Sequence, residues 1–180
     1  MSGTSANSCR ARHWVQQPGD PPATWKTGAV FPVRSAGRAL IIHDDRLLVT
    51  VLHGDDGEFW LLPGGGQDHG EPLPETVRRE CREEIGCDVI VGDLAVVRDY
   101  VQANHEFARF DSTFHQVDLV FHAQLVPGAE PCLNTPDERQ VGVRWVPLAE
   151  VPTSPLYPQA LRGWLAADPE LRPRYLGDVN

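Results

Sequence analysis

The chain has 180 residues, enough for one domain with a sizeable core, and 41% of them are hydrophobic while 23% are charged. No apolar run approaches the roughly 20 residues that span a bilayer, and a formal net charge of −9 disfavours a nucleic-acid polymer, whose nonspecific binding requires a basic surface. We therefore expect a soluble globular protein without a membrane or nucleic-acid partner, for which a small anion carried with a metal ion is a compatible ligand.

Three regions differ in composition along the chain. Residues 1–28 are rich in Ser, Pro, Gly and Gln without periodicity, which predicts a flexible tail. They contain no apolar core of the kind that a secretory signal needs, so we expect a cytoplasmic protein. We place the folded domain at 29–170 and a short C-terminal tail at 171–180. The four cysteines form no CxxC pair, which favours reduced thiols acting as small apolar residues.

The first half of the domain contains short strands followed by a helix. Two apolar β-type runs, 39–42 and 47–52, surround a polar turn and predict a hairpin. A short strand, "FWLL", then leads to the glycine-rich "PGGG", where glycines permit close approach of the backbone. Prolines at the start of the segment, in "EPLPE", and a glycine at position 86 predict a helix over 73–85.

The second half is dominated by longer strands. The segments 87–101 and 112–126 are expected to be long strands joined by the polar loop "QANHEFARFD". A further strand over 141–148 precedes a closing helix whose apolar face holds Leu161, Trp164 and Leu165. Mixed strands with one central and one terminal helix predict an α/β or α+β sandwich.

The predicted helix at 73–85 separates its apolar and charged residues. At roughly 100° per residue, Val77, Cys81 and Ile85 form one apolar stripe that can face a core. Glu80 and Glu84 are neighbours four residues apart, a like-charge placement that costs a few tenths of a kcal/mol on an isolated helix. A divalent cation would offset this repulsion, because Mg²⁺ prefers carboxylate oxygens together with water and phosphate.

A solvated surface helix with salt bridges is the simpler interpretation of such a run, and the helix alone does not decide between the two. The preceding "PGGGQDHGE" favours the cation, because it brings flexible backbone and a further carboxylate, Glu71, to the start of the same helix. Backbone amides at a helix N-terminus can hold phosphate. The backbone of Gly64, Gly65 and Gly66 is therefore our candidate for the cofactor- and phosphate-binding segment.

These residues resemble the signature of the Nudix hydrolases. Gly65, five residues, Glu71, seven residues and then "RECREEIGC" from Arg79 to Cys87 match all the fixed Gly, Glu and Arg positions of that family. The strand pattern around the motif is also similar, from about residue 34 to 165. Cys81 and Cys87 stand where large aliphatic residues are usual, which leaves the charged positions unchanged.

The resemblance implies an α/β fold of the Nudix type, an α/β/α sandwich with a mixed β-sheet in which the motif forms a loop-helix-loop. It implies hydrolysis of the diphosphate linkage in a nucleoside diphosphate derivative, with Mg²⁺ or Mn²⁺ as cofactor. Carried over position by position, the metal ligands would be Glu80, Glu83 and Glu84. Glu71 would support the metal site, and Arg79 would orient the glutamates.

The chemistry of the residues agrees with this implication, because a carboxylate cluster can approach an anionic diphosphate only when metal ions screen the charge. The identity of the general base stays open. By analogy with some relatives it is Glu80 or Glu83; in others it is a carboxylate on a later loop, for which Glu138 is our candidate. Glu138 is equally well explained as an exposed charge. Asp118, His115, Gln116 and His122 alternate along a predicted strand, so each faces either the site or solvent.

Substrate selection is less evident from the sequence. Trp60, Phe107 and Phe110 are candidates for stacking on a nucleobase, although aromatic residues beside strands are more often core, as we expect for Trp145 and Trp164. The substrate classes left open are ADP-ribose, nucleotide sugars, dinucleoside polyphosphates and dNTPs. Two alternatives share the fold: a non-catalytic nucleotide-sensing module and an enzyme similar to isopentenyl diphosphate isomerase. A homodimer is compatible with the sequence, which contains no feature that decides it.

Overall fold

The computed structural model describes residues 32–105, 108, 113–134 and 139–180. Within these ranges, the strands are β1 (Arg34–His43), β2 (Arg46–Gly54), β3 (Gly57–Leu61), β4 (Gly64–Gly66), β5 (Val89–Val101), β6 (His115–Leu125), β7 (Gln140–Pro147) and β8 (Tyr175–Asp178). The α-helices are α1 (Leu73–Ile85) and α2 (Ala160–Ala166), and single 3-10 turns lie at Gln102–Asn104, Val151–Thr153 and Pro169–Leu171.

The strands form one mixed sheet in the order β3-β2-β1-β6-β5-β8, with β4 paired to β1 and β7 paired to β2. The β1–β6 and β5–β8 pairs are parallel, whereas the other pairs are antiparallel. The predicted hairpin is confirmed: β1 and β2 are joined by Asp44 and Asp45, both with positive φ. Asp tolerates the left-handed region better than most residues, and two such residues match the twist of a tight hairpin.

Helix α1 has the bounds that the sequence predicts. It begins after Pro72 and ends at Gly86, whose φ of 65° is left-handed and whose N–H donates to Cys81 O. Val77, Cys81 and Ile85 are buried as predicted. A Cβ on Gly37 of β1 would lie 3.0 Å from Val77 Cγ2, so a glycine there lets the helix approach the strand closely.

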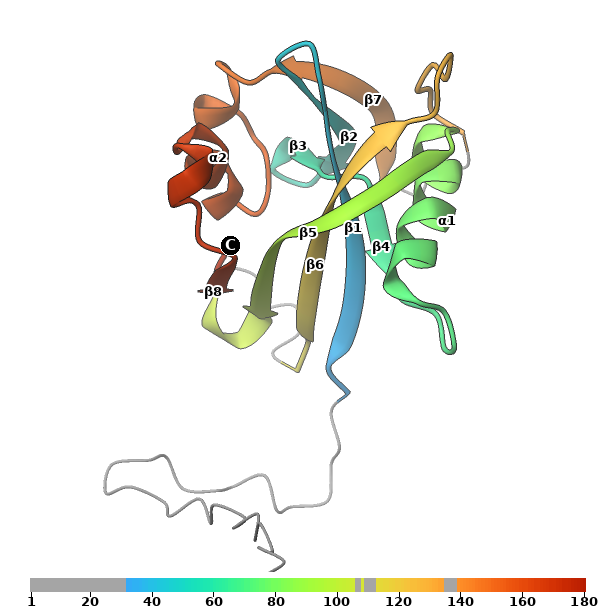
Figure 1. Cartoon of the computed structure of the whole chain (residues 1–180). Helices are drawn as coiled ribbons and strands as arrows, with labels where there is room; N and C mark the ends of the chain where they lie inside the picture. Colours follow the sequence, from blue (N-terminus) through green and yellow to red (C-terminus); the bar gives the residue numbers. More distant parts are fainter. Residues whose placement is uncertain (1–31, 106–107, 109–112, 135–138) are drawn as a thin grey trace, which may run out of the picture. The chain divides into compact units, whose positions relative to one another are not determined.

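Two apolar cores lie on opposite faces of the sheet. Ala39 and Ile41 of β1 pack with Val77, Cys81 and Ile85 under α1. Leu40, between them in the chain, belongs to the other core, which includes α2 residues. This alternation follows from the strand period of two, and it gives the predicted α/β/α sandwich, with α1 and α2 on opposite sides in Figure 1.

The C-terminal region contains a strand that the sequence did not predict. Residues 171–180 were expected to be a tail, but Tyr175–Asp178 form β8 and pair with β5. The strand has only four residues and contains Gly177, so it shows no clear apolar alternation.

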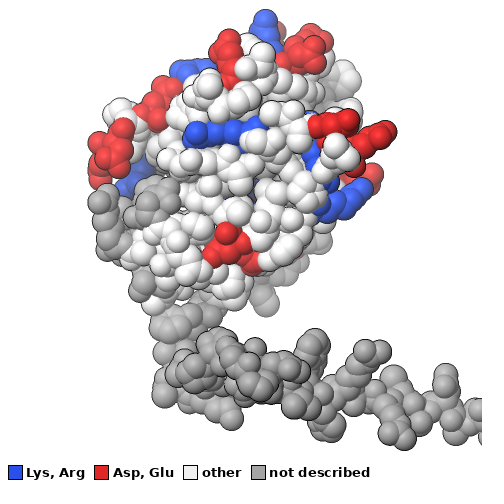
Figure 2. All heavy atoms as spheres, turned by 90° about the vertical axis from the view of Figure 1, so that its left-hand side faces the viewer, with Lys and Arg blue, Asp and Glu red and all other residues white. Residues whose placement is uncertain are grey.

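The side of the molecule that carries α2 and β8 is mostly uncharged, with acidic and basic side chains mainly near its margins (Figure 2). None of the described helices is long and apolar enough to cross a membrane.

Candidate functional site

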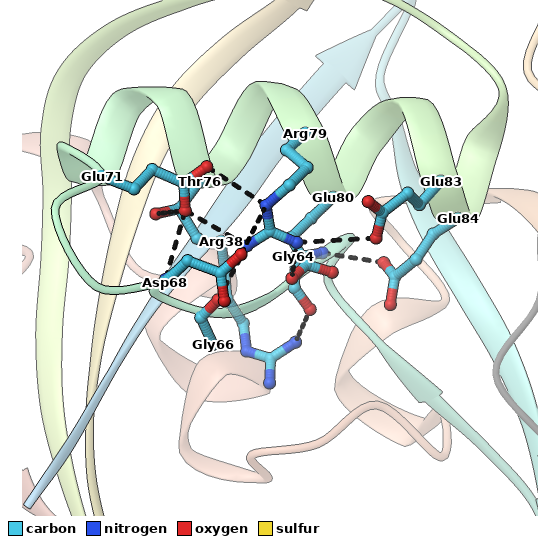
Figure 3. A network of polar contacts seen from close by, with 10 residues as sticks. All are labelled: Arg38, Gly64, Gly66, Asp68, Glu71, Thr76, Arg79, Glu80, Glu83 and Glu84. Atoms are coloured by element: carbon cyan, nitrogen blue, oxygen red, sulfur yellow. Dashed lines mark hydrogen bonds and ion pairs between the residues drawn. The ribbon is translucent and has the colours of Figure 1, made fainter.

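Arg79 is the centre of a polar network between α1 and the Gly64–Gly66 segment (Figure 3). Its Nε and Nη2 donate to the two carboxylate oxygens of Glu71 at 3.1 and 3.2 Å. Its Nη1 donates to Glu80 Oε1 at 2.7 Å, and Glu83 Oε2 lies 3.5 Å from the same nitrogen. One planar guanidinium therefore contacts three of the acids of the predicted motif.

Glu71 connects the loop before α1 to the first turns of the helix. Besides the two bonds from Arg79, its Oε2 accepts from Thr76 Oγ1 at 2.8 Å and from the Asp68 N–H at 3.3 Å. Hydrogen bonding from Arg79, more than any other contact, lowers the pKa of Glu71 to about 2. Glu71 therefore stays ionised at neutral pH and holds the loop on the helix.

Glu80 lies against the glycine segment. A Cβ on Gly65 would lie 2.5 Å from the Glu80 carboxylate, so glycine at this position leaves room for the acid where it lies in this structure. The Glu80 side chain is 14% exposed, and burial raises its pKa while the adjacent Arg79 acts in the opposite direction. The structure therefore places a partly desolvated carboxylate directly over the Gly65 backbone.

Glu84 holds the neighbouring glycine. The Gly64 N–H donates to Glu84 Oε2 at 2.8 Å. Gly64 has a φ of 138°, and a Cβ there would lie 2.2 Å from Gly37 O, so both the backbone conformation and the lack of space require glycine. At the end of the same segment, the carbonyl oxygen of Gly66 accepts from Arg79 Nη2 at 2.9 Å. Gly64 and Gly66 thus bind motif side chains through their backbone.

The donor set of this site fits a hard divalent cation in its chemistry. It offers carboxylate oxygens from one side of α1, and Glu83 is half exposed, so an ion could reach it from solvent. In the described part of the chain, no three acidic, histidine or cysteine side chains already converge as a metal cage. Glu71 and Glu80 accept hydrogen bonds from Arg79, and Glu84 accepts one from the Gly64 N–H.

The structure brings together five predicted side chains: Glu71, Arg79, Glu80, Glu83 and Glu84. Glu138 lies outside the described residues. Two described residues on either side of it in the sequence contact the last turn of α1: Asn134 Nδ2 donates to Arg82 O at 2.8 Å, and Gln140 Nε2 donates to Glu84 O at 2.9 Å.

Asp118 faces neither solvent nor the exposed acids, contrary to both alternatives from the sequence. It is 1% exposed and lies between two arginines that the sequence analysis did not consider, Arg38 and Arg98. Arg38 Nε donates to Oδ1 at 3.1 Å, and Arg98 Nε donates to Oδ2 at 2.7 Å. Gln116, another of the candidates, also donates to Oδ1. A charged residue inside the apolar "SAGRALII" was the one available signal for Arg38.

The remaining candidates divide between the core and the surface. Trp60 is 8% exposed and belongs to the core, where Arg144 lies over its ring, so it is not available for nucleobase stacking in this structure. Trp164 is buried as expected, and Trp145 is partly buried. His115 contacts Asp99, while His122 is exposed. Phe107 and Phe110 lie outside the described residues.

Comparison with known proteins identifies relatives that share this motif and fold. A family model described as NUDIX domain matches residues 29–167. Nucleoside triphosphatase NudI of Salmonella arizonae is 40% identical over 100 residues, which cover 53% of this chain and 70% of that protein. NudI of Salmonella agona is 29% identical over the same shares of both chains.

Solved structures agree with the fold. The crystal structure of a MutT NUDIX hydrolase from Burkholderia pseudomallei superposes with a TM-score of 0.59 and 26% identity, covering 73% of this chain and 95% of that one. A NUDIX hydrolase from Nitrosomonas europaea gives a TM-score of 0.63 at 19% identity, covering 80% and 93%. An ADP-ribose pyrophosphatase from Streptococcus suis gives 0.54 at 21% identity, covering 82% and 98%. The last two show similarity of fold alone.

Proposed function

We propose that this chain, which belongs to the Nudix family of pyrophosphohydrolases, cleaves the diphosphate linkage of a nucleoside diphosphate derivative with the aid of Mg²⁺ or Mn²⁺. The observation that carries the proposal is the arrangement around Arg79, which holds Glu71, Glu80 and Glu83 beside the glycine segment. The same proposal gives the protein a small-molecule nucleotide as its partner and the cytoplasm as its location.

Glu80, Glu83 and Glu84 would hold the metal, with Glu71 in support. When bound, the metal ion would screen the charge of the diphosphate and lower the pKa of an attacking water. The chain's own contribution is orientation: Arg79 fixes the acids, and the Gly64–Gly66 backbone, which requires glycine at Gly64, lies close enough for Glu80 and Glu84 to contact it.

The general base would be a carboxylate, since no described histidine contacts this cluster of acids. Glu80 and Glu83 are candidates because they lie beside the glycine segment and toward solvent, respectively. Glu138 is the candidate from a later loop, and its support is indirect. Asn134 and Gln140, on either side of it in the chain, both donate to backbone carbonyls of α1.

The names of the relatives suggest the substrate classes to test. NudI is named as a nucleoside triphosphatase, and two structural relatives are titled as an ADP-ribose pyrophosphatase and a UDP-X diphosphatase. All such substrates share a nucleoside joined to a diphosphate, which is the part that a metal and a carboxylate cluster would engage. The alternative of a nucleotide sensor without activity is less favoured, because Glu71, Glu80, Glu83 and Glu84 are all present. An isomerase similar to isopentenyl diphosphate isomerase has no further support.

The test is release of nucleotide product from ADP-ribose, nucleotide sugars, dinucleoside polyphosphates and dNTPs, with Mg²⁺, with Mn²⁺ and with EDTA. We expect turnover of one class that requires metal and falls by about 100-fold or more in Glu83→Gln, because loss of a ligand removes several kcal/mol of charge stabilisation.

Glu75→Gln is the matched control. It removes a carboxylate from the same helix, and Glu75 is an exposed residue whose carboxylate pairs with Arg78. It should retain activity close to the wild type. Absence of turnover by a folded wild-type protein, or equal activity of Glu83→Gln and wild type, would contradict the proposal.

A further inference from the structure

The Gly64 residue is held from both faces of the sheet. From the α1 side, Glu84 Oε2 accepts from its N–H at 2.8 Å. From the other side, Arg38 Nη1 donates to its carbonyl at 2.7 Å and to Leu62 O at 3.1 Å. Arg38 can reach it because Arg38 and Gly64 are register partners in the β1–β4 pair.

Strand alternation explains the direction of Arg38. Gly37 faces α1, where a Cβ would meet Val77, and so the adjacent Arg38 points to the opposite face, as Leu40 does. Figure 3 shows its guanidinium beside Gly64, on the side of the glycine segment that lies away from α1. Arg38 thus contacts the active-site loop without being part of the Nudix motif.

Sheet register supplies the partner that fixes Arg38. Asp118 of β6 lies opposite Ala36 of β1 and opposite Arg98 of β5. Its carboxylate therefore lies between both arginines, with Arg98 at 2.7 Å and Arg38 at 3.1 Å. Gln116 adds a hydrogen bond to Asp118 at 2.8 Å. A buried carboxylate bonded to three side chains has few alternative positions, so it restrains the guanidinium of Arg38.

The charges of this cluster do not cancel. The guanidiniums of Arg38 and Arg98 share the Asp118 carboxylate. Arg38 also interacts electrostatically with Glu84 and Glu80. Burial disfavours the charged form of Arg38, yet the negative charges of Asp118, Glu84 and Glu80 outweigh burial and raise its pKa. In Arg98, by contrast, burial and the like charge of Arg38 lower the pKa. Arg38 is therefore electrostatically linked to Glu80 and Glu84 as well as bonded to the loop that they contact.

We infer that Arg38, held by Asp118, is a positioning residue of the active site: it fixes the backbone of Gly64, and through that backbone the Glu84 carboxylate that would ligate the metal. This inference rests on the proposed function for its metal. It assigns a role to a pair of residues 80 positions apart in the chain, both outside the motif.

The test measures Mn²⁺ binding by calorimetry in the absence of substrate, for wild type, Arg38→Lys and Arg172→Lys. Lysine keeps the charge and the stem but cannot donate to Leu62 O, Gly64 O and Asp118 from one rigid group. Supporting residues of this kind typically change metal affinity by about 10- to 100-fold, and we expect Arg38→Lys to weaken Mn²⁺ binding within that range.

Arg172→Lys is the matched control. Arg172 also donates to two backbone carbonyls, Ala167 O and Leu165 O, and its guanidinium lies over the Trp164 ring. These contacts are all in the C-terminal region. It should bind Mn²⁺ like wild type even if its melting temperature falls. Hydrogen exchange of the Gly64 amide supplies a second readout, which should become faster in Arg38→Lys and not in Arg172→Lys.

The outcomes separate the inference from the proposed function. If wild type binds no Mn²⁺, the proposed metal site fails, and the inference fails with it. If wild type binds Mn²⁺ and Arg38→Lys binds it equally, with unchanged exchange at Gly64, the inference alone is overturned. Should Arg38→Lys not fold, Arg98→Lys replaces it, because Arg98 fixes Asp118 without contacting Gly64. A several-fold weaker affinity is then expected, and an unchanged affinity overturns the inference.

Discussion

Two ionic clusters meet at the glycine segment and are built in different ways. The first cluster joins Arg79 to Glu71, Glu80 and Glu83, within a short stretch of sequence, and lies between α1 and the glycine segment (Figure 3). The second joins Arg38, Asp118 and Arg98 from three strands and is buried. The first can rearrange around a ligand because water reaches it, whereas the second is a rigid support in which each charge depends on its partners.

This difference has an energetic consequence. Exposed ion pairs contribute about 0–1 kcal/mol because solvent screens them and ordering the side chains has an entropic cost. Removal of one partner from a buried group leaves an unpaired charge out of water, which is far more unfavourable. The Arg79 cluster is part-buried, with Glu71 17% and Glu80 14% exposed, so it lies between these two limits, while Asp118 is 1% exposed. We therefore expect substitutions in the Arg79 cluster to change activity more than stability, and substitutions of Asp118 to change stability strongly.

The largest expected effect is that of Asp118→Asn on folding. Two buried guanidiniums would lose their shared counter-charge, and the free energy of unfolding should fall by about 3–5 kcal/mol. Urea denaturation measures it. Asp88→Asn is the control, since Asp88 pairs with Arg82 on the surface and its loss should change stability by less than about 1 kcal/mol. Equal effects of the two substitutions would remove the distinction between the clusters.

A smaller effect, on catalysis, is expected from Arg79→Lys. Lysine cannot bind Glu71 through two nitrogens while also reaching Glu80 and Gly66 O, so the acids would lose their fixed orientation. We expect kcat/KM to fall by about 10- to 100-fold with little change in the urea midpoint. Arg78→Lys, which alters an exposed pair with Glu75, should behave like wild type. A loss of stability as large as that of Asp118→Asn would show that Arg79 is mainly structural.

The smallest expected effect is a pH dependence of stability at β8. Burial alone would raise the pKa of Asp178, but hydrogen bonds from Asn104, the Val101 N–H and His105 lower it to about 2, from an ordinary value of 3.8. A depressed pKa stabilises the folded state above the unfolded pKa, and this stabilisation is lost as the pH falls from about 4 toward 2. The contribution should be about 1 kcal/mol after allowance for partial exposure.

Urea denaturation of wild type and Asp178→Asn at pH 5 and pH 2.5 measures this contribution. The difference in unfolding free energy between the two proteins should be larger at pH 5 by about 1 kcal/mol. A difference that does not depend on pH would mean that the carboxylate of Asp178 is not specifically stabilised by its contacts in β8.

Local features were predictable wherever the physical cause is local. Prolines at the start and Gly86 at the end set the bounds of α1, and the spacing of Val77, Cys81 and Ile85 shows which side of it is buried. The Nudix resemblance rests on the same stretch, so the first cluster was anticipated residue by residue. The strand β8 was not, because a four-residue strand at the sheet edge depends on pairing with β5 and not on its own composition.

The sequence by itself determined the motif, the helix that displays it and the kinds of side chain available for chemistry, because these follow from spacings of a few residues and from backbone preferences. Only the tertiary structure decided that Asp118 is a buried counter-ion, that Trp60 is core, and that Arg38 reaches Gly64. The reason is physical: those contacts join residues from separate strands, and their existence depends on the order and register of the sheet, which no short stretch of sequence specifies.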